Sequence, residues 1–92
     1  MMLKFGYFLL CRCKLTGLIA TACGDDAIRI FREDLLLSGN SHQPSFSLVA
    51  CQPKAHLQEV NGLSWNPFVA GELASCSDDG EVKLWEVTYV GP

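Results

Sequence analysis

Clusters of basic residues are missing from this 92-residue sequence, in which Arg12 and Lys14 are the densest cationic pair. The formal net charge is −3 at pH 7, and charged residues make up only 18% of the chain. Because binding to a phosphate backbone requires a clustered cationic face, the composition argues against nucleic acid as a partner. The hydrophobic fraction of 49% argues against a disordered tail and predicts one small folded unit.

Long hydrophobic runs are missing as well. The apolar N-terminal run, MMLKFGYFLLC from Met1 to Cys11, is shorter than the roughly 20 residues that a membrane-spanning helix needs. A signal peptide has the same order of a lysine and an apolar run, but no small-residue cleavage site follows before Gly17. We therefore interpret the run as a strand or as a poorly fitting end rather than as a targeting segment. No membrane partner is expected.

The five cysteines match neither a disulfide framework nor a complete metal-ligand set. Their number is odd and their spacings fit no secreted pattern, so reduced thiols in a cytosolic or nuclear protein are the simpler interpretation. Cys11 and Cys13 form a C-x-C pair, but no second pair or nearby histidine completes four ligands. We expect no metal and no cofactor. A metal- or cluster-carrying protein that uses Cys11, Cys13 and either Cys23 or Cys76 is the alternative.

The sequence does contain an internal repeat, in two similar copies. Ile19–Phe31 reads IATACGDDAIRIF, and Leu73–Trp85 reads LASCSDDGEVKLW, 54 residues later and without an internal gap. Each copy is a run of apolar and small residues, then a tight turn containing Asp, then an alternating strand that ends in an aromatic residue. A repeat in so short a chain indicates part of an array of similar units.

Short strand patterns bounded by turn signals fill the chain, and no segment predicts a helix. This spacing is typical of all-β antiparallel structure with seven or eight strands. After Phe31 we expect Arg32–Asp34 to leave the sheet and a loop to occupy residues 34–45. The Leu35–Leu37 run inside that loop is expected to pack on a neighbouring surface, or alternatively to mark a partner contact. The expected strands cover residues 5–10, 18–23, 27–31, 45–50, 60–65, 72–77 and 81–86.

Four residues around the second copy have side chains that suit a buried chain of hydrogen bonds. They are His56, Ser75, Asp79 and Trp85. His56 comes just before one predicted strand and Ser75 lies in the next strand. Asp79 lies in the turn that follows, and Trp85 lies near the end of the strand after that turn. In an up-and-down sheet, Asp79 can accept from His56, and His56 can link to the Ser75 hydroxyl. Ser75 can then accept from the Trp85 indole N–H, so that no polar group needs water.

A Ser/His/Asp hydrolase is the tempting alternative for the same residues. A nucleophilic serine must be exposed beside an oxyanion hole. Ser75 instead lies between Ala74 and Cys76 in a strand of small residues, with no glycine-rich elbow around it. We therefore favour a structural network that fixes a turn onto a strand, and expect no enzyme activity.

The strings AHLQEVNGLSWNP and LASCSDDGEVKLW resemble a WD40 repeat, in which His, Ser or Thr, Asp and Trp form the structural tetrad of a propeller blade. This resemblance assigns the tetrad to His56, Ser75, Asp79 and Trp85, with Trp85-Glu86 in place of the family's closing Trp-Asp. In the first copy only part of a tetrad matches. Thr21 and Asp25 stand at the Ser/Thr and Asp positions, Phe31 replaces the Trp, and no upstream His corresponds.

The resemblance implies about two antiparallel WD40-type β-propeller blades, an incomplete propeller. Residues 1–12 form a divergent N-terminal segment, residues 13–50 a partial blade with a loop insertion at 34–45, and residues 51–92 a blade. Since propellers typically close with 4–8 blades, we expect either part of a larger protein or a chain that needs partners, and weak stability of the isolated chain.

The GDDAIRIF string together with SCSDDGEV more specifically resembles the WD40 proteins of the cytosolic iron–sulfur assembly machinery, over roughly residues 13–85. That resemblance implies a non-catalytic scaffold that helps deliver clusters to apo-proteins. Its partners would be protein subunits of the iron–sulfur targeting complex and apo iron–sulfur proteins, in the cytoplasm and also the nucleus. Glu59 and Asp78, near the expected tetrad, are candidate partner contacts by position. A WD40 module of another complex, or a truncated product without independent function, are the alternatives.

Overall fold

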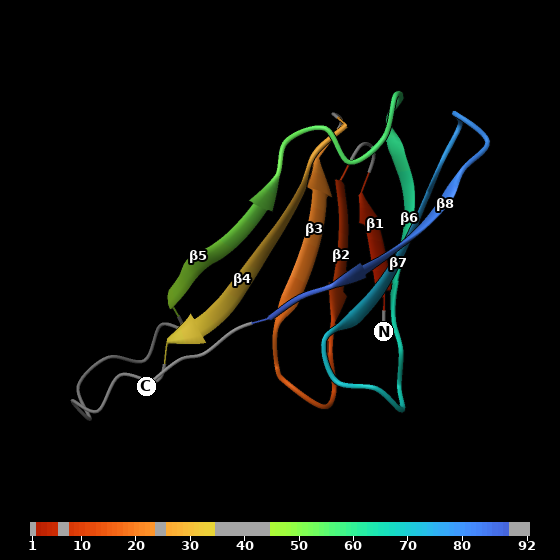
Figure 1. Cartoon of the computed structure of the whole chain (residues 1–92). Helices are drawn as coiled ribbons and strands as arrows, with labels where there is room; N and C mark the ends of the chain where they lie inside the picture. Colours follow the sequence, from red (N-terminus) through yellow and green to blue (C-terminus); the bar gives the residue numbers. More distant parts are fainter. Residues whose placement is uncertain (1, 6–7, 24–25, 35–44, 89–92) are drawn as a thin grey trace.

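Two antiparallel sheets make up the described part of the chain (Figure 1). The computed structural model describes residues 2–5, 8–23, 26–34 and 45–88. These residues form eight strands and no helix, which confirms the all-β fold predicted from the sequence, and none of them forms a helix that could cross a membrane. The strands are β1 (Met2–Phe5), β2 (Phe8–Arg12), β3 (Ile19–Cys23), β4 (Ile28–Asp34), β5 (Ser45–Gln52), β6 (Val60–Trp65), β7 (Glu72–Ser77) and β8 (Val82–Glu86).

The first sheet has the strand order β1-β2-β3-β4-β5, so every strand pairs with its neighbour in the sequence. Since side chains alternate along a strand, the register divides them between two faces. The inner face carries small and aliphatic side chains that are all buried: Leu9, Cys11, Ala20, Ala22, Ile28 and Ile30. The outer face carries Leu10, Ile19, Thr21, Phe31, Phe46 and Leu48.

The second sheet has the order β6-β7-β8. Its inner face presents Leu63, Trp65, Leu73, Ser75 and Trp85. Its outer face presents Ala74, Cys76, Val82 and Leu84. The bounds of β6 and β7 coincide with those predicted from the sequence, because Val60–Trp65 and Glu72–Ser77 are both closed by clear turn residues.

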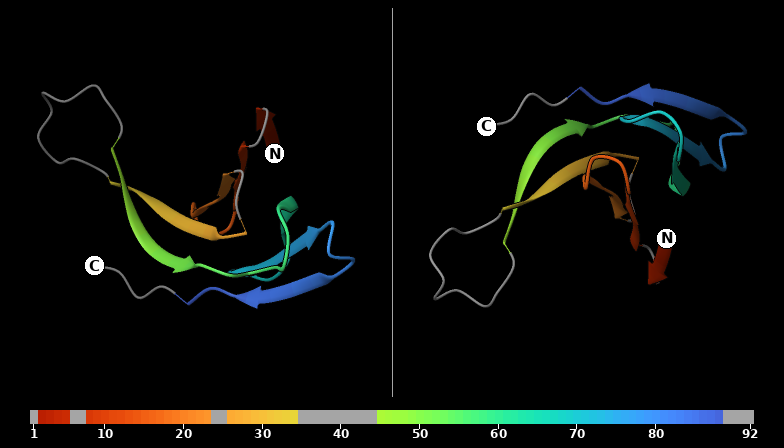
Figure 2. Two further views of the ribbon diagram at one scale, coloured as in Figure 1. Left: turned by 90° about the horizontal axis from the view of Figure 1, so that it is seen from above. Right: turned by 90° about the horizontal axis from the view of Figure 1, so that it is seen from below.

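The core lies where the inner faces of the two sheets meet, and Figure 2 shows the second sheet stacked against the first. The alanines of β3 share this core with larger side chains of β6 and β7, and small residues on one sheet allow a dense packing of large ones from the other. The Trp65 indole N–H also donates a hydrogen bond of 2.9 Å to the carbonyl oxygen of Cys11. This bond joins residues 54 positions apart and ties the two sheets together at the end of β6.

The end of β4 differs from the prediction, because Arg32–Asp34 stay in the sheet instead of leaving it. These residues pair in register with Ser45–Ser47 of β5. The Asp34 carboxylate accepts hydrogen bonds from the hydroxyls of Ser45 and Ser47, at 3.2 and 2.6 Å, and from Arg32 Nε at 3.1 Å. These polar side chains stay in the sheet because they have partners on β4 itself and on the adjacent strand β5.

The predicted division into three segments does not follow the sheets. Strands β1 and β2, within residues 1–12, belong to the first sheet, and the boundary at 50/51 falls inside β5. The division therefore stays a sequence-based prediction. Most of the predicted insertion at 34–45, with Leu35–Leu37, lies outside the described residues.

Gly71 offers a test of how the second sheet closes. Its φ of +82° is in the left-handed region, and a Cβ placed there would lie 2.6 Å from the carbonyl oxygen of Val87. We expect Gly71→Ala to lower the free energy of unfolding by about 3 kcal/mol, since it combines backbone strain with overlap against backbone. Gly80→Ala is the matched control, because Gly80 has a similar φ of +85° and nothing within 4 Å of its Cβ position.

Chemical unfolding of both variants and the parent chain measures the difference. Gly80→Ala should cost only the strain, about 1 kcal/mol. Equal losses in the two variants would show that the approach of Val87 to Gly71 is unimportant.

Candidate functional site

The four candidate tetrad residues converge between the two sheets at the end marked by the β7–β8 turn. His56 lies in the segment between β5 and β6, Ser75 in β7, Asp79 in the turn and Trp85 in β8. His56 Nδ1 lies 3.0 Å from Asp79 Oδ2, and His56 Nε2 lies 2.7 Å from Ser75 Oγ. The Trp85 indole N–H donates to Ser75 Oγ at 2.8 Å. The structure thus brings all four residues into one linear chain of contacts.

One assignment of protons satisfies every group in this chain. A neutral imidazole with its proton on Nδ1 donates to the Asp79 carboxylate and accepts the Ser75 hydroxyl proton on Nε2. Ser75 Oγ keeps a lone pair for the indole N–H of Trp85. Every described buried side-chain nitrogen and oxygen has a hydrogen-bond partner, as expected for groups shielded from water.

Asp79 does more than accept from the imidazole. Its Oδ2 also accepts from the Leu57 amide at 3.0 Å, and its Oδ1 accepts from the Glu81 amide at 2.8 Å. Burial raises the pKa of Asp79, but these two amides and His56 outweigh it and hold the pKa below its ordinary value. The carboxylate therefore fixes the β7–β8 turn to the segment that precedes β6.

A lysine adds a second link at the same end. Lys83 Nζ, on β8, donates at 2.8 Å to the carbonyl oxygen of Ala55, the residue before His56. The same ammonium lies 6.0 Å from the ring centroid of Trp85. The segment around His56 is thus held from both β7 and β8.

This arrangement does not present a nucleophile. Ser75 has a relative exposure of 2%, and its oxygen lies between the imidazole of His56 and the indole of Trp85. A serine that attacks a substrate must reach it, and this one is enclosed on both sides by its own hydrogen-bond partners. The geometry is that of a packed hydrogen-bond network.

His56, Asp79 and Glu81 also offer ligand atoms within 4.8 Å of one another. A cation there would have to displace the hydrogen bond between the imidazole and Asp79. The amide of Glu81 already occupies the other oxygen of that carboxylate. We therefore assign these groups to hydrogen bonding.

The first copy of the repeat has a much reduced counterpart. Thr21 is buried, and its hydroxyl donates to the carbonyl oxygen of Arg29 at 3.3 Å, across the β3–β4 ladder. Phe31, at the position of Trp85, has no indole donor. Asp25, the other predicted member, lies outside the described residues.

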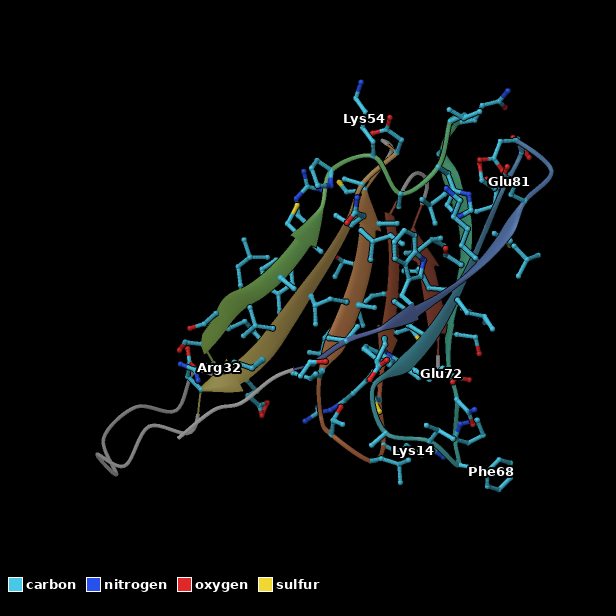
Figure 3. The ribbon with its side chains drawn as sticks, viewed as in Figure 1. Lys14, Arg32, Lys54, Phe68, Glu72 and Glu81 are labelled. Atoms are coloured by element: carbon cyan, nitrogen blue, oxygen red, sulfur yellow. The ribbon has the colours of Figure 1, made fainter. Side chains whose placement is uncertain are left out.

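The two candidate partner contacts lie near the network. Asp78, in the β7–β8 turn, is exposed and accepts a hydrogen bond from the amide of Asn61, at 2.5 Å. Glu59 is half-buried just before β6. Figure 3 shows Glu81, from the same turn, at one end of the molecule and Phe68 at the opposite end.

The cysteines, all within the described residues, are free thiols. Cys11 and Cys13 are buried in the core, whereas Cys23 and Cys51 are exposed. Burial raises the pKa of Cys13, but hydrogen bonds from Thr16 and from the Gly71 backbone lower it overall. The C-x-C pair therefore contributes to packing between the sheets.

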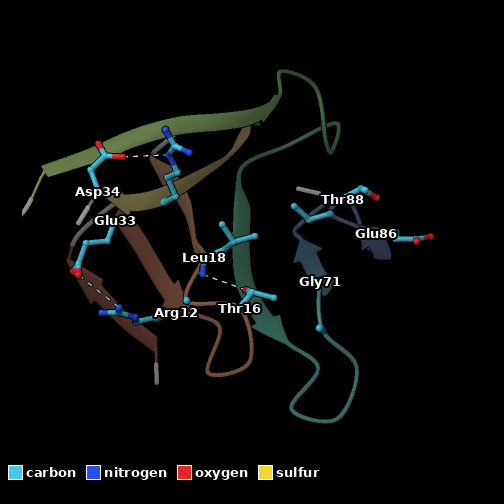
Figure 4. A pocket seen from close by; sticks show the side chains of 12 residues that line it. Arg12, Thr16, Leu18, Glu33, Asp34, Gly71, Glu86 and Thr88 are labelled. Carbon is cyan, nitrogen blue, oxygen red and sulfur yellow. Dashed lines mark hydrogen bonds and ion pairs between the residues drawn. The ribbon is translucent and has the colours of Figure 1, made fainter. Parts of the chain in front are cut away.

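An open cavity of about 790 Å³ lies at the opposite end of the sheets from the network (Figure 4). Its walls come from the β2–β3 turn, the end of β4 and the segments that flank β7 and β8. Four of the five charged side chains on them lie in pairs, with Arg12 3.9 Å from Glu33 and Arg32 3.1 Å from Asp34, and the fifth is Glu86. Since these pairs offset each other, we assign no ligand to the cavity.

Two antiparallel sheets, the second of which carries a His–Ser–Asp–Trp network, point to the class of protein. The family model described as WD domain, G-beta repeat matches residues 46–86. Residues 46–86 therefore match a WD40 repeat, and the two antiparallel sheets are consistent with partial propeller blades.

The particular relatives are cytosolic iron–sulfur assembly proteins. The chain is 61% identical over 74 residues to the probable cytosolic iron-sulfur protein assembly protein CIAO1 of Rattus norvegicus, and 60% identical over 74 residues to that of Mus musculus. It is 55% identical over 75 residues to the Ciao1 protein of Drosophila mojavensis. These matches cover 80–82% of the chain but only 21–22% of each relative. The chain thus spans about a fifth of the length of the curated relatives it matches, and the resemblance predicted from the sequence is confirmed.

Loss of the Ser75 hydroxyl tests the network. We expect Ser75→Ala to lower the free energy of unfolding by about 1–3 kcal/mol, because Trp85 Nε1 and His56 Nε2 would be left buried without a partner. Ser64→Ala on β6 is the control, since Ser64 is exposed. Thermal or urea unfolding of both variants decides the matter, and equal stability of the two would contradict the structural role of Ser75.

The lowered pKa of Asp79 predicts a pH dependence. A carboxyl whose pKa is lower in the folded state stabilises it above the unfolded pKa of about 3.9, and this contribution is lost as pH falls through the folded pKa. The stability difference between the parent chain and Asp79→Asn should therefore be largest near neutral pH and shrink below about pH 4. Asp78→Asn is the control and should follow the parent chain. A difference that does not change with pH would refute the assignment.

Proposed function

We propose that this chain acts as a non-catalytic WD40 scaffold in cytosolic iron–sulfur protein assembly, helping to deliver clusters to apo-proteins through protein–protein contacts. The observation that carries the proposal is the 61% identity, over 80% of the chain, to a relative named for that process. Identity of this level extends beyond the tetrad positions, which a WD40 repeat of any function would share.

The site supports a binding role over a catalytic one. The polar groups of His56, Ser75 and Asp79 are engaged with one another and with backbone amides. Such a network uses its hydrogen-bonding capacity to hold a blade in shape, which leaves the surface turns to make contacts. WD40 folds host many functions, so the identity of the relatives, not the fold, names the process.

The partners in this proposal are protein subunits of the iron–sulfur targeting complex and apo iron–sulfur proteins. Their contact surface would include Asp78, which is exposed beside the network, and Glu59 at the start of β6. Both are carboxylates, so they would suit a basic surface on the partner. The proposed location is the cytoplasm, as the relatives' name indicates, and also the nucleus.

A second candidate is a WD40 module of a different complex, or a product without independent function. The match of the family model to residues 46–86 is equally compatible with either. The proposed scaffold differs from both of these alternatives in that its sequence should be able to replace the corresponding part of an iron–sulfur assembly protein.

A chimaera provides the test. The 74 residues of this chain that match the rat relative would replace the corresponding segment of that relative. In cells depleted of the endogenous protein, we expect the chimaera to restore the activity of cytosolic iron–sulfur enzymes. A chimaera that accumulates and unfolds at the same temperature as the rat protein, yet restores no activity, would overturn the proposal.

Charge reversal in the same chimaera tests the proposed contacts. Glu59→Lys and Asp78→Lys should weaken co-purification of the targeting subunits at unchanged protein level. Glu86→Lys is the matched control, because Glu86 is an exposed carboxylate on β8, away from the β7–β8 turn. Equal binding by all three variants would place the contact elsewhere.

A further inference from the structure

An asparagine followed by a glycine lies in β6, beside the tetrad network. Asn61 precedes Gly62, whereas Asn66, just after the same strand, precedes Pro67. An asparagine cyclises when the backbone nitrogen of the next residue attacks its side-chain amide carbon, Cγ. Glycine favours this attack because it has no side chain to crowd the nitrogen. Proline prevents it because its nitrogen carries no hydrogen. The two asparagines therefore differ in the chemistry open to them.

The ladder between β6 and β7 is irregular at Asn61. Val60 lies opposite Ser77, and Gly62 lies opposite Cys76. The register shifts between these two pairs, so Asn61 has no residue opposite it on β7. A bulged residue of this kind is left unpaired and disrupts the ladder locally. Asn61 is also only half-buried. It is therefore less restrained than a residue inside a regular ladder.

The packing of β7 beside β6 requires glycine at position 62. A Cβ placed on Gly62 would lie 2.8 Å from Cys76 Sγ, which is closer than side chains pack. A larger residue at this position would have to displace the thiol. The fold therefore retains, directly after Asn61, the residue type that makes cyclisation easiest.

One hydrogen bond holds the Asn61 side chain within the described part of the chain. Its Nδ2 donates to Asp78 Oδ1 at 2.5 Å, a short distance that suits a carboxylate acceptor. Asp78 is exposed in the β7–β8 turn, so this bond can break without opening the core. The bond links β6 to the turn that also carries Asp79 of the network.

Asp79 provides a contrast, because it also precedes a glycine, Gly80, but is held on both oxygens. Oδ1 accepts a hydrogen bond from one backbone amide, and Oδ2 accepts from another and lies 3.0 Å from His56 Nδ1. Cyclisation of Asp79 would require all of these contacts to break. An ionised carboxylate also resists attack by a nucleophile. Of the two residues, the structure leaves Asn61 free to react.

We propose that Asn61 is a site of spontaneous deamidation through a succinimide formed with Gly62. The Gly62 nitrogen loses its proton to water and bonds to Asn61 Cγ. The bond between Cγ and Nδ2 breaks, and the amide nitrogen takes up a proton and leaves as ammonia. Water then opens the ring at either carbonyl carbon, which gives aspartate or isoaspartate at position 61. The net change is the uptake of one water and the loss of one ammonia, without oxidation or reduction.

Deamidation would alter the link between β6 and the β7–β8 turn. Aspartate at position 61 lacks the donor to Asp78 and brings a second carboxylate close to the first. Like charges at such a separation repel each other, so the turn should loosen from β6. The surface beside Asp78 and Glu59, which the proposed function assigns to partners, would become more acidic. The deamidation itself does not rest on that function.

Mass spectrometry of the full chain tests the proposal. The chain is incubated at slightly alkaline pH and physiological temperature, with a parallel sample in urea, and both are then digested. We expect a gain of one dalton at Asn61, with isoaspartate among the products, because direct hydrolysis of the amide gives aspartate alone. Asn66 is the internal control, and Asn61 should exceed it at least tenfold. The folded chain should deamidate at no less than a tenth of the rate in urea.

Two results of this incubation would overturn the proposal. One is equal deamidation at Asn61 and Asn66. The other is an unchanged Asn61 in the folded chain while the sample in urea deamidates.

Urea unfolding of Asn61→Asp tests the loosened turn separately. We expect this variant to have a folding equilibrium constant at least fivefold lower than that of the parent chain. Combining it with Asp78→Asn removes one of the two carboxylates and should restore most of the loss. A variant as stable as the parent chain, or a loss that Asp78→Asn does not reverse, would refute the predicted repulsion.

Discussion

The shared core, in which small residues of β3 pack together with large side chains of the second sheet, is the constraint on which the other features depend. Ala20 and Ala22 lie in one buried cluster with Leu63 and Leu73, and burial of each such leucine contributes about 1.5–3 kcal/mol. A larger residue at Ala20 would push the sheets apart. The distance between the sheets then sets where the indole of Trp65 can reach a carbonyl, and where the segment around His56 must run.

The tetrad network is best understood as a consequence of that packing. Once Trp85 lies in the interface, its indole N–H needs an acceptor away from water, and Ser75 on the adjacent strand supplies one. The imidazole of His56 then satisfies Ser75, and Asp79 satisfies the imidazole. Each polar group in the series is needed because the previous one is buried. The same residue types that suggest a hydrolase in the sequence are thus fully engaged within the fold.

The sequence allowed much of this to be predicted, for reasons that differ between elements. The strands from Val60 to Glu86 were readable because alternation and turn residues agree there, and the network followed from residue types at known strand positions. The continuation of β4 through Asp34 was not readable, since its stabilising hydroxyls lie on β5, beyond a loop. The hydrogen bond from Trp65 to Cys11 could not be predicted either, because its acceptor is a backbone carbonyl oxygen, which every residue has.

The boundaries of the matched WD repeat differ by one strand from the boundary between the two sheets. The matched repeat begins at residue 46, inside β5, which pairs with β4 in the first sheet, and then continues into the second sheet. A pull on the connection between the sheets is therefore directed along β5 and loads its ladder with β4 in shear, where all of the hydrogen bonds resist together. Strand β5 is therefore the mechanical link between the two sheets, and the second sheet should detach from the first only after the β4–β5 ladder has broken.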